Sequence, residues 1–376
     1  MGWLPEQPGN GLDRVYHSLA HALPEAGVDM TGLVAGSSAV SVSSSGRVSA
    51  FAPDASPLPT RILGVRRAAL RALDAGVDVV AAHFALYTLP LLDLLGDVPL
   101  VVHFHGPWAL ESASEGDGRV KTWLKKGLET RVYRRADRCI VLSEAFRSLL
   151  HTTHGVPLDR IRVIPGGVDV DRFAVDASSR AARSRLGWPQ DRPIVLSVRR
   201  LARRMGLDNL IEAFGHVRRA LPDAVLYIAG TGPRRAALEA QIRARGLCEH
   251  VHLLGFVPDR DLPYAYRAAD LSVVPTVRLE GFGLITVESL ATGTPVLVTP
   301  VGGLPETVRD LSEALILPDA GVDALARGLT AALRSPASLP SRSACREYAR
   351  SAFGWPAIAR RTRAVYAEAV HAHGFH

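Results

Sequence analysis

Short apolar segments alternate with helical segments through most of this chain, and this alternation constrains its fold more than any other feature. In the first half, the apolar run Leu100–Phe104 follows helical stretches at 61–73 and 85–95. In the second half, the apolar runs are Pro193–Val198, Val225–Ala229, Val251–Leu254, Leu271–Pro275 and Val296–Val298. The pattern predicts an α/β fold with doubly wound parallel sheets, in which ligands bind at the carboxyl ends of the strands. A length of 376 residues predicts two domains.

Composition excludes several other classes of protein. Hydrophobic residues make up 47% of the chain, which is enough for two cores, and a charged fraction of 22% argues against disorder. No run approaches the roughly eighteen apolar residues of a membrane span, and Met1–Glu6 has neither the basic nor the apolar region of a signal peptide. The 3 cysteines are far apart and in no metal-ligand spacing, which favours a reduced, cytoplasmic location. The net charge of +7 comes mainly from arginine, and we attribute it to a GC-rich genome, not to a nucleic-acid partner.

The most informative local stretch runs from Glu280 to Pro295. Gly281 and Gly283 allow the backbone to approach a ligand closely, and the helix that follows offers free N–H groups and a positive dipole end to a diphosphate. Glu288 lies deeper in that helix, where a carboxylate can accept hydrogen bonds from both hydroxyls of a ribose. A buried strand–helix unit with two solvated glutamates would show the same pattern.

Glu280 and Glu288, with seven residues between them and Gly-Phe-Gly inside, resemble the E-x7-E signature of retaining glycosyltransferases of family 4. The resemblance covers nearly the whole chain and implies the GT-B fold, two Rossmann-like domains that face each other across a cleft. We therefore expect an acceptor-binding domain over residues 1–175, a nucleotide-sugar-binding domain over 176–352, and a helix over 353–376 that returns to the first domain.

The same resemblance implies a reaction. A hexose-type sugar would pass from a nucleotide diphosphate sugar to a hydroxyl of a glycan, a lipid or a small natural product, with retention of configuration. Family members are thought to use metal-independent front-face substitution, so we expect no metal and no cofactor. The donor is predicted to be a UDP-sugar, with a GDP-sugar as the second choice.

Several donor-site roles follow from the resemblance. The donor sugar is expected at Glu280, Gly281, Phe282 and Gly283, the diphosphate at Gly283 and Leu284, the ribose at Glu288, and the base near Phe256 and Val257. The family usually shows an arginine after the first strand of the second domain and a lysine five residues later, both on the diphosphate. Arg200 matches the arginine, but Met205 stands at the lysine position. We expect Arg204 to replace the lysine, with Arg203 as the other candidate; a solvated basic loop is the structural alternative.

The first domain carries the remaining candidates. The family's Gly-rich loop, which approaches the diphosphate and the acceptor, is present with Gly9 and Gly11, but only Met1–Leu4 remain of the strand that should precede it. Either Met1 lies inside the natural protein or the first strand is a stub. A parallel sheet without its central strand would expose backbone and apolar groups, so we favour the first of these alternatives.

The strand that ends at Phe104 places His105 at the carboxyl edge of the predicted sheet, where ligands bind. In the family, a His-Gly pair at this position lies beside the reacting centre. Together with Arg200 and Glu280, we predict His105 as catalytic. A metal site from His103 and His105 is disfavoured because no third ligand of suitable spacing is visible; a histidine merely buried in the core is the other alternative. Asn10, Trp108 and Glu111 are candidate acceptor contacts, although a solvated loop explains Glu111 and Glu115 equally well.

Two further patterns remain. The basic segment 119–138, in which Trp123, Leu124, Leu128, Val132 and Tyr133 interleave with lysine and arginine, fits either a helix at the inner membrane face or a solvated helix with an apolar stripe on the core. We favour the second. The D-x-D patterns at 169–171 and 259–261 resemble the metal motif of another glycosyltransferase class, but we interpret them as a domain crossing and a helix cap.

Two other functions stay open from the sequence. A nucleotide-sugar 2-epimerase shares the architecture and would act on the donor without an acceptor. A catalytically weak nucleotide-sugar-binding protein is suggested by Met205 and the short amino end.

Overall fold

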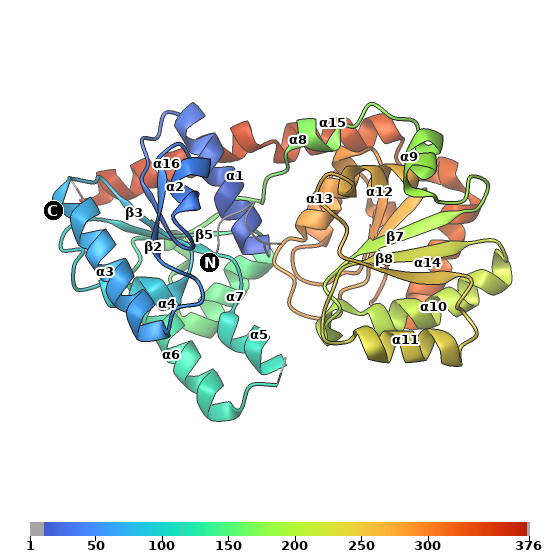
Figure 1. Ribbon diagram of the computed structural model, residues 1–376, viewed down its shortest axis with the longest axis horizontal. Coiled ribbons are helices and arrows are strands. Elements are labelled where there is room, and N and C mark those ends of the chain that lie inside the picture. The colour runs from blue at the N-terminus through green and yellow to red at the C-terminus, as the bar shows by residue number, and fades with distance from the viewer. Residues whose placement is uncertain (1–10, 115, 374–376) are drawn as a thin grey trace. The chain divides into compact units, whose positions relative to one another are not determined.

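The structure is a computed structural model that describes residues 11–114 and 116–373, and these form two compact units. Unit 1 comprises the chain up to Gly167 and the C-terminal segment from Trp355; unit 2 is Val168–Gly354 (Figure 1). We predicted these two boundaries after residues 175 and 352, and in the structure they follow Gly167 and Gly354. Among the described residues, no helix combines the length and the apolar character needed to cross a bilayer.

Unit 2 is built on a five-stranded sheet in the order β11-β10-β7-β8-β9, and all of its neighbouring strands are parallel. Its strands are β7 (Ile194–Val198), β8 (Val225–Ala229), β9 (Val251–Gly255), β10 (Leu271–Val274) and β11 (Val296–Val298). The chain runs outward from β7 to β8 and β9, and then returns to the other side of β7 with β10. The carboxyl ends of β7 and β10 therefore form the topological switch point, where such sheets bind ligands.

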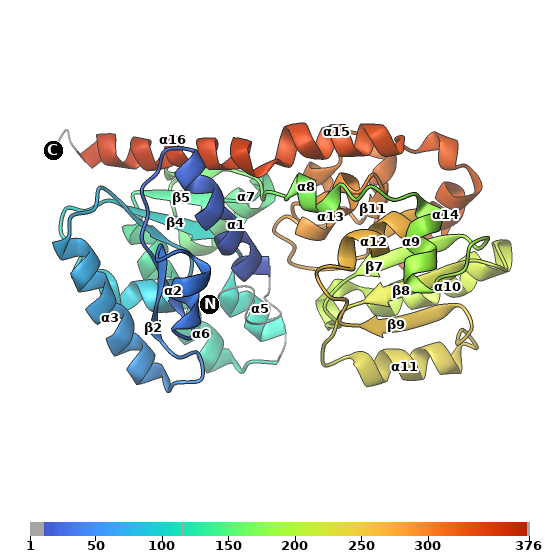
Figure 2. The ribbon, with the colours of Figure 1, turned by 45° about the horizontal axis from the view of Figure 1, so that its top comes forward.

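Helices cover both faces of this sheet, with α10 and α11 on one side and α12 and α13 on the other (Figures 1 and 2). The helices of unit 2 are α8 (Val170–Phe173), α9 (Ser179–Leu186), α10 (Leu207–Ala220), α11 (Arg235–Ala244), α12 (Leu262–Ala268), α13 (Leu284–Ala291), α14 (Val322–Arg334) and α15 (Arg342–Phe353). Its 3-10 turns are η3 (Arg203–Met205), η4 (Pro305–Thr307), η5 (Glu313–Leu315) and η6 (Pro336–Ser338). Every residue of β8, β10 and β11 is buried, as expected for strands covered on both faces.

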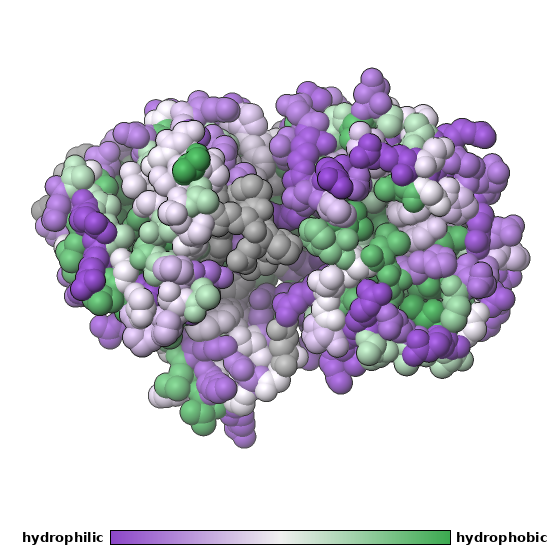
Figure 3. Space-filling view, in the orientation of Figure 1, coloured by the Kyte–Doolittle hydropathy of each residue, from purple (hydrophilic) through white to green (hydrophobic). Residues whose placement is uncertain are grey.

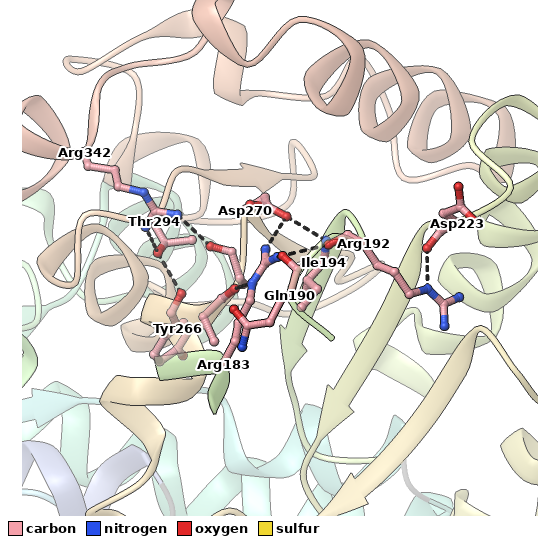
Figure 4. Close-up of polar contacts among 11 residues, drawn as sticks. Arg183, Gln190, Arg192, Ile194, Asp223, Tyr266, Asp270, Thr294 and Arg342 are labelled. Carbon is pink, nitrogen blue, oxygen red and sulfur yellow. Dashed lines mark hydrogen bonds and ion pairs between the residues drawn. The ribbon is translucent and has the colours of Figure 1, made fainter. Parts of the chain in front are cut away.

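A polar network fastens the amino ends of β7 and β10 (Figure 4). The buried Arg183 of α9 donates to the carbonyl oxygens of Ala268 (2.9 Å) and Gln190 (2.7 Å) and pairs with Asp270 at 2.7 Å. Asp270 also accepts the backbone N–H of Ile194 at 2.8 Å. One arginine thus ties a helix, a loop and the starts of two adjacent strands together.

We expect Arg183→Met to lower the free energy of unfolding of unit 2 by about 3 kcal/mol, because the carbonyls and the carboxylate that it satisfies lose a buried partner. Denaturant titration measures this change. Arg192→Met is the matched control, since Arg192 is only half-buried and donates chiefly to the Asp223 carbonyl. Equal stability of the two variants would contradict the structural role of Arg183.

In the described part of unit 1, the strands form two separate parallel sheets. One has the order β3-β4-β5-β6 and the other pairs β1 with β2. The strands are β1 (Gly32–Ala35), β2 (Val48–Ala52), β3 (Val80–Ala82), β4 (Leu100–Phe104), β5 (Arg138–Val141) and β6 (Ile161–Val163). The helices are α1 (Gly11–Glu25), α2 (Ala39–Ser43), α3 (Leu58–Asp74), α4 (Ala85–Thr88), α5 (Trp108–Ser114), α6 (Arg119–Arg135), α7 (Glu144–His154) and α16 (Trp355–His373), with 3-10 turns η1 (Leu89–Leu91) and η2 (Leu158–Arg160).

The C-terminal helix completes the core of unit 1. Ile358, Val365 and Tyr366 of α16 pack in one cluster with Leu19 of α1 and Val101 of β4. Its polar side is fixed as well, since Glu368 pairs with Arg138 at 2.9 Å and also with Arg162. The fully buried β4 lies at the centre of the larger sheet and ends directly before His105.

Candidate active site

A buried ion pair joins the loops that follow β7 and β10. Arg199, the first residue after β7, pairs with Glu280 and donates to the hydroxyl of Thr276. Only 7% of the Arg199 side chain and 13% of the Glu280 side chain are exposed. Sequence reasoning chose Arg200 and missed Arg199, although two arginines directly after a buried strand indicate that one of them faces inward. Arg200 itself is exposed.

Arg204 holds the turn that presents Glu280. Its Nη1 donates to the carbonyl oxygen of Leu279 at 2.8 Å, and Leu279 has a left-handed backbone with φ of 54°. A non-glycine residue in this conformation is strained and needs such support. Met205, at the position of the expected lysine, is a core side chain with 6% exposure. The contact of Arg204 in this structure is with the loop, and its role at a diphosphate remains a prediction.

Glycines allow the loops at this edge of the sheet to pack backbone against backbone. A Cβ on Gly302 would lie 1.9 Å from the carbonyl oxygen of Glu280, and one on Gly230 would lie 1.9 Å from that of Arg199. Both glycines also have positive φ values. Any side chain at these positions would therefore move Arg199 or Glu280.

Helix α13 begins at Leu284, shortly after Glu280, and no side chain caps its first turn. Its N-cap residue, Gly283, has φ of 80° and offers no capping oxygen, so the first turn is suited to an anion. Thr286 in this turn is fully buried, and its Oγ1 has no hydrogen-bond partner among the described residues. Sequence reasoning missed Thr286; a hydroxyl in the first turn after Gly-x-Gly was the available signal. Phe282 is 2% exposed and its ring lies against Phe353, so only its backbone can face a sugar.

The predicted ribose and base residues lie on separate elements of unit 2. Glu288 of α13 is 8% exposed and accepts a hydrogen bond from the hydroxyl of Tyr266 at 3.1 Å. Phe256, which follows β9, is 52% exposed and presents an aromatic face to solvent. Their contacts with a nucleotide remain predictions.

In unit 1, His105 belongs to a cluster of three histidines. His83, which follows β3, approaches His105 with Nδ1 and Nε2 3.0 Å apart, while Nε2 of His103 lies 2.8 Å from the hydroxyl of Tyr366. The expectation that no third ligand lies near His103 and His105 was therefore wrong, because the ligand atoms of all three lie within 4.8 Å of one another. The parallel strands β3 and β4 bring His83 in, although it is distant in sequence. The rings of His103 and His105 stack within 12° and 20° of the His83 plane, an arrangement that does not direct three lone pairs to a tetrahedral centre.

Burial keeps these imidazoles neutral. Desolvation lowers the pKa of His103 and of His105 to about 3, and it lowers the pKa of His83 as well. Nδ1 of His105 is buried and has no hydrogen-bond partner within the described part of the chain. A neutral imidazole with one unused nitrogen can hydrogen-bond a sugar hydroxyl or a phosphate oxygen.

Glu129 positions the predicted acceptor residue Trp108. Its carboxylate accepts the backbone N–H groups of Trp108 (2.9 Å) and Ala109 (3.2 Å) and so caps α5. Burial raises the pKa of Glu129 to about 7, and these hydrogen bonds oppose the shift. Lys125 lies over the Trp108 ring, 4.5 Å from its centroid. Glu129 was missed because its partners lie 20 and 21 residues earlier in the chain, on a different helix.

The remaining candidates of unit 1 lie on α5, at the start of α1, or outside the described residues. Glu111 is half-buried on α5 beside Gly106, where a Cβ would lie 3.1 Å from its Oε1. Gly11 is the first residue of α1, and Asn10, Gly9 and Glu115 lie outside the described residues.

Both D-x-D patterns make structural contacts. Asp169 caps α8 by accepting the backbone N–H of Arg172 at 3.0 Å. Asp261 pairs with Arg185 at 2.9 Å, and Asp259 lies 3.4 Å from Arg172. Asp261 stands at the N-cap position of α12 but its side chain makes no cap hydrogen bond, so the predicted helix cap at 259–261 is wrong and the ion pair with Arg185 takes its place.

Known protein families and relatives match this chain in sequence over most of its length. Residues 9–172 match the family Glycosyltransferase Family 4, and residues 178–352 match Glycosyl transferases group 1. The chain is 33% identical over 319 residues to the D-inositol 3-phosphate glycosyltransferase of Xylanimonas cellulosilytica, a match that covers 81% of this chain and 75% of that one. It is 30% identical to the 2-deoxystreptamine glucosyltransferase of Streptomyces kanamyceticus, over 74% of each chain.

A third relative matches over a shorter region. The GDP-mannose-dependent alpha-(1-6)-phosphatidylinositol monomannoside mannosyltransferase of Mycolicibacterium smegmatis is 35% identical over 208 residues, which is 54% of each chain. The match thus spans about half the length of that relative.

Solved structures show the same fold. Sucrose-phosphate synthase from Thermosynechococcus elongatus superposes with a TM-score of 0.79 at 24% identity, over 97% of this chain and 94% of that one. Anabaena HepE in complex with UDP-glucose gives 0.78 at 20% identity, over 98% of each chain. These likenesses establish the GT-B fold. With the sequence matches, they identify the chain as a glycosyltransferase that belongs to family 4.

Proposed function

We propose that this glycosyltransferase moves a hexose-type sugar from a nucleotide diphosphate sugar to a hydroxyl acceptor with retention of configuration and without a metal. The observation that carries the proposal is the assembly at the switch point of unit 2. There the buried Arg199–Glu280 pair, the uncapped start of α13 and the buried Glu288 lie on adjacent loops and one helix. A cationic loop and an amide-rich helix end suit a diphosphate, while a buried carboxylate suits ribose hydroxyls.

In this scheme, the bond between the anomeric carbon and the diphosphate oxygen breaks while a bond to the acceptor oxygen forms on the same face. The leaving diphosphate takes the acceptor proton. Arg200, Arg204 and the first turn of α13 stabilise the charge that develops on the diphosphate. Neutral His105 donates or accepts one hydrogen bond at a hydroxyl beside the anomeric carbon, and Glu280 orients the sugar.

A thermal-shift screen tests the donor. We expect UDP or GDP and the corresponding sugar nucleotides to raise the melting temperature of the protein, because a ligand at 100 times its Kd stabilises by about 2.7 kcal/mol. Glu288→Gln should weaken the response to nucleoside diphosphates but not to inorganic diphosphate, which lacks a ribose. A protein that responds to no nucleotide at all would contradict the proposal.

The product distinguishes the remaining functions. Retention predicts that the anomeric configuration of the donor persists in the product, which nuclear magnetic resonance measures, and metal independence predicts unchanged turnover in a chelator. An epimer formed from donor alone would instead indicate a 2-epimerase. Donor binding without turnover on a broad acceptor panel would indicate a binding protein.

The acceptor side of the proposal is supported by α6. The expectation of an apolar stripe packed on the core holds for Val132 and Tyr133 but is wrong for the start of the helix, where Val120 and Trp123 are each 72% exposed and Leu124 is 58% exposed. This end of α6 protrudes from unit 1, and hydrophobic surface gathers on it (Figure 3). No described element covers this end of the helix in the ribbon views (Figures 1 and 2), which agrees with the exposure of its apolar side chains.

Basic residues surround these apolar side chains. Arg119, Lys121 and Lys126 lie on the same two turns, so the start of α6 has the composition of a segment that inserts shallowly into an anionic membrane. We therefore propose contact with the inner membrane face and an acceptor carried there, a reversal of the alternative favoured from sequence. The relative that acts on a phosphatidylinositol mannoside has an acceptor of this kind in its name.

Trp123→Ser/Leu124→Ser is expected to reduce binding to vesicles with anionic lipid by at least about tenfold, because two interfacial apolar anchors are lost. Vesicle sedimentation measures the binding. Leu63→Ser is the matched control, since Leu63 is an exposed leucine of α3, 49% accessible. If the wild type does not sediment with anionic vesicles, or if the control loses as much binding, contact through α6 is wrong.

A further inference from the structure

Three arginines gather at the amino edge of the unit 2 sheet, away from the candidate active site. They are Arg267 in the last turn of α12, and Arg342 and Arg346, which lie one turn apart on α15. We call these three residues the arginine cluster. Helix α13 begins at the carboxyl edge of the sheet, after Gly283, and ends at this amino edge, where the turn 292–294 leads into β11.

Hydrogen bonds from α15 hold two of the arginines against the ends of α12 and α13. Arg342 donates from Nη2 to the carbonyl oxygen of Ala269 at 2.9 Å and from Nη1 to the hydroxyl of Thr294 at 3.1 Å (Figure 4). Arg346 donates from Nε to the carbonyl oxygen of Thr292 at 3.3 Å. Each guanidinium carries five N–H donors, so these contacts occupy only part of the capacity of the cluster.

Arg267 has a nitrogen that the protein does not use. Its Nε donates to the carbonyl oxygen of Ala177 at 2.6 Å, but its Nη1 is buried and has no hydrogen-bond partner within the described residues. Burial, together with the charges of Arg342 and Arg346, lowers the pKa of Arg267 to about 10. A lowered arginine pKa indicates that the positive charge around it lacks a compensating anion.

Neighbouring carboxylates do not neutralise the cluster. Asp270 pairs with Arg183 at 2.7 Å, and the acidic residues next to the cluster in sequence, Asp176 and Glu347, are exposed. Asp270 also acts on Arg342, but burial still keeps the pKa of Arg342 below its ordinary value. In the part of the chain that the structure describes, none of the three arginines forms an ion pair with a carboxylate.

We propose that the arginine cluster binds a tetrahedral oxyanion of the phosphate class, either free phosphate or the phosphate group of a monoester. Guanidinium forks match phosphate oxygens, and a phosphate dianion has enough acceptors for more than one arginine. It would bind the N–H groups of Arg267 and Arg346 that no carbonyl oxygen occupies. The 8 residues of α13 separate this site from the predicted diphosphate site by about 12 Å. The proposal therefore does not depend on the proposed function.

Titration with inorganic phosphate, at constant ionic strength, tests the site. We expect a rise in melting temperature of at least about 3 °C at saturation, because the folded state alone binds the anion. Arg346→Gln should weaken binding, measured by calorimetry, at least about tenfold, since it removes a charged fork but retains an amide donor near Thr292. Arg350→Gln, an exposed change one turn later on α15, is the matched control and should bind like the wild type. Equal affinity for glucose 1-phosphate and phosphate assigns the free anion, and tighter binding of the ester assigns a phosphate monoester.

Arginine modification locates the anion in the unaltered protein. Phosphate at ten times its Kd should slow the reaction of Arg267 and Arg346 with phenylglyoxal about tenfold, while Arg350 keeps its rate; mass spectrometry of the peptides measures both. A diphosphate site also attracts phosphate, so Arg200→Ala is titrated in parallel and should retain the full response. Loss of binding in Arg200→Ala would overturn the proposal. It is equally wrong if the wild type does not respond, if Arg346→Gln binds normally, or if Arg350 is protected as much as Arg346.

Discussion

Arg200→Ala is expected to retain its fold and to lose at least about a hundredfold in turnover, because removing one donor that stabilises developing charge typically costs about 3–4 kcal/mol in the barrier. Arg200 is exposed at the carboxyl end of β7, so its loss leaves the core of unit 2 intact. Steady-state kinetics with the donor found by the thermal-shift screen measures the effect, and the melting temperature verifies the fold. Near-normal turnover would refute the role of Arg200.

The neighbouring arginines serve as controls. Arg219→Ala, an exposed change in the last turn of α10, should leave turnover unchanged. Arg204→Ala should lower turnover more than Arg203→Ala, because Arg204 also supports the Leu279 turn before Glu280. Arg199→Ala should instead cost about 3–5 kcal/mol of stability, since Glu280 would be left as a buried, unpaired carboxylate.

The second large effect is loss of stability in acid. The pKa of His103 and of His105 is lowered by burial from 6.5 to about 3, so each is neutral in the folded state and takes up a proton on unfolding below pH 6.5. Stability from this source is fully present above pH 6.5 and decreases as the pH falls toward 3. At 1.36 kcal/mol per pH unit below 6.5, the two residues together cost about 4 kcal/mol at pH 5.

The pKa shift of Glu129 has the opposite effect on the stability of the protein in acid. Its pKa is raised from 4.5 to about 7, so the folded state holds a proton that the unfolded state releases, and stability rises as the pH falls through this window. This offsets about 2 kcal/mol of the loss at pH 5. Urea titrations of unit 1 signals at pH 7 and pH 5 should therefore show a net loss in the wild type and a larger loss in Glu129→Gln. Equal stability of the wild type at the two pH values would show that the histidines are not neutral when folded.

The E-x7-E stretch and the apolar runs were sufficient to predict the parallel sheets, the family and the placement of Glu280 and Glu288 near one helix. These features are local in sequence: an apolar run between turn residues specifies a buried strand, and glycines before a helix specify a close approach. Boundaries were less reliable. The helix expected over 85–95 ends at Thr88 and continues as the 3-10 turn Leu89–Leu91, because Pro90 supplies no backbone N–H.

Contacts between distant segments could not be predicted in this way. His83 meets His105 because parallel pairing aligns the ends of β3 and β4, and Glu129 caps α5 because α6 folds back on it. The start of α6 is a third case, because its pattern of lysine, tryptophan and leucine is the same whether the apolar residues face the core or the solvent. Only the packing of its neighbours decides which.

By itself the sequence determined the fold class, the family and the chemistry expected at the switch point, because strand and helix periodicity and the glycine turns are properties of adjacent residues. The tertiary structure alone decided which arginine is buried against Glu280 and which histidines meet. Each of these depends on which strands lie side by side, and strand order brings together residues that no local pattern connects.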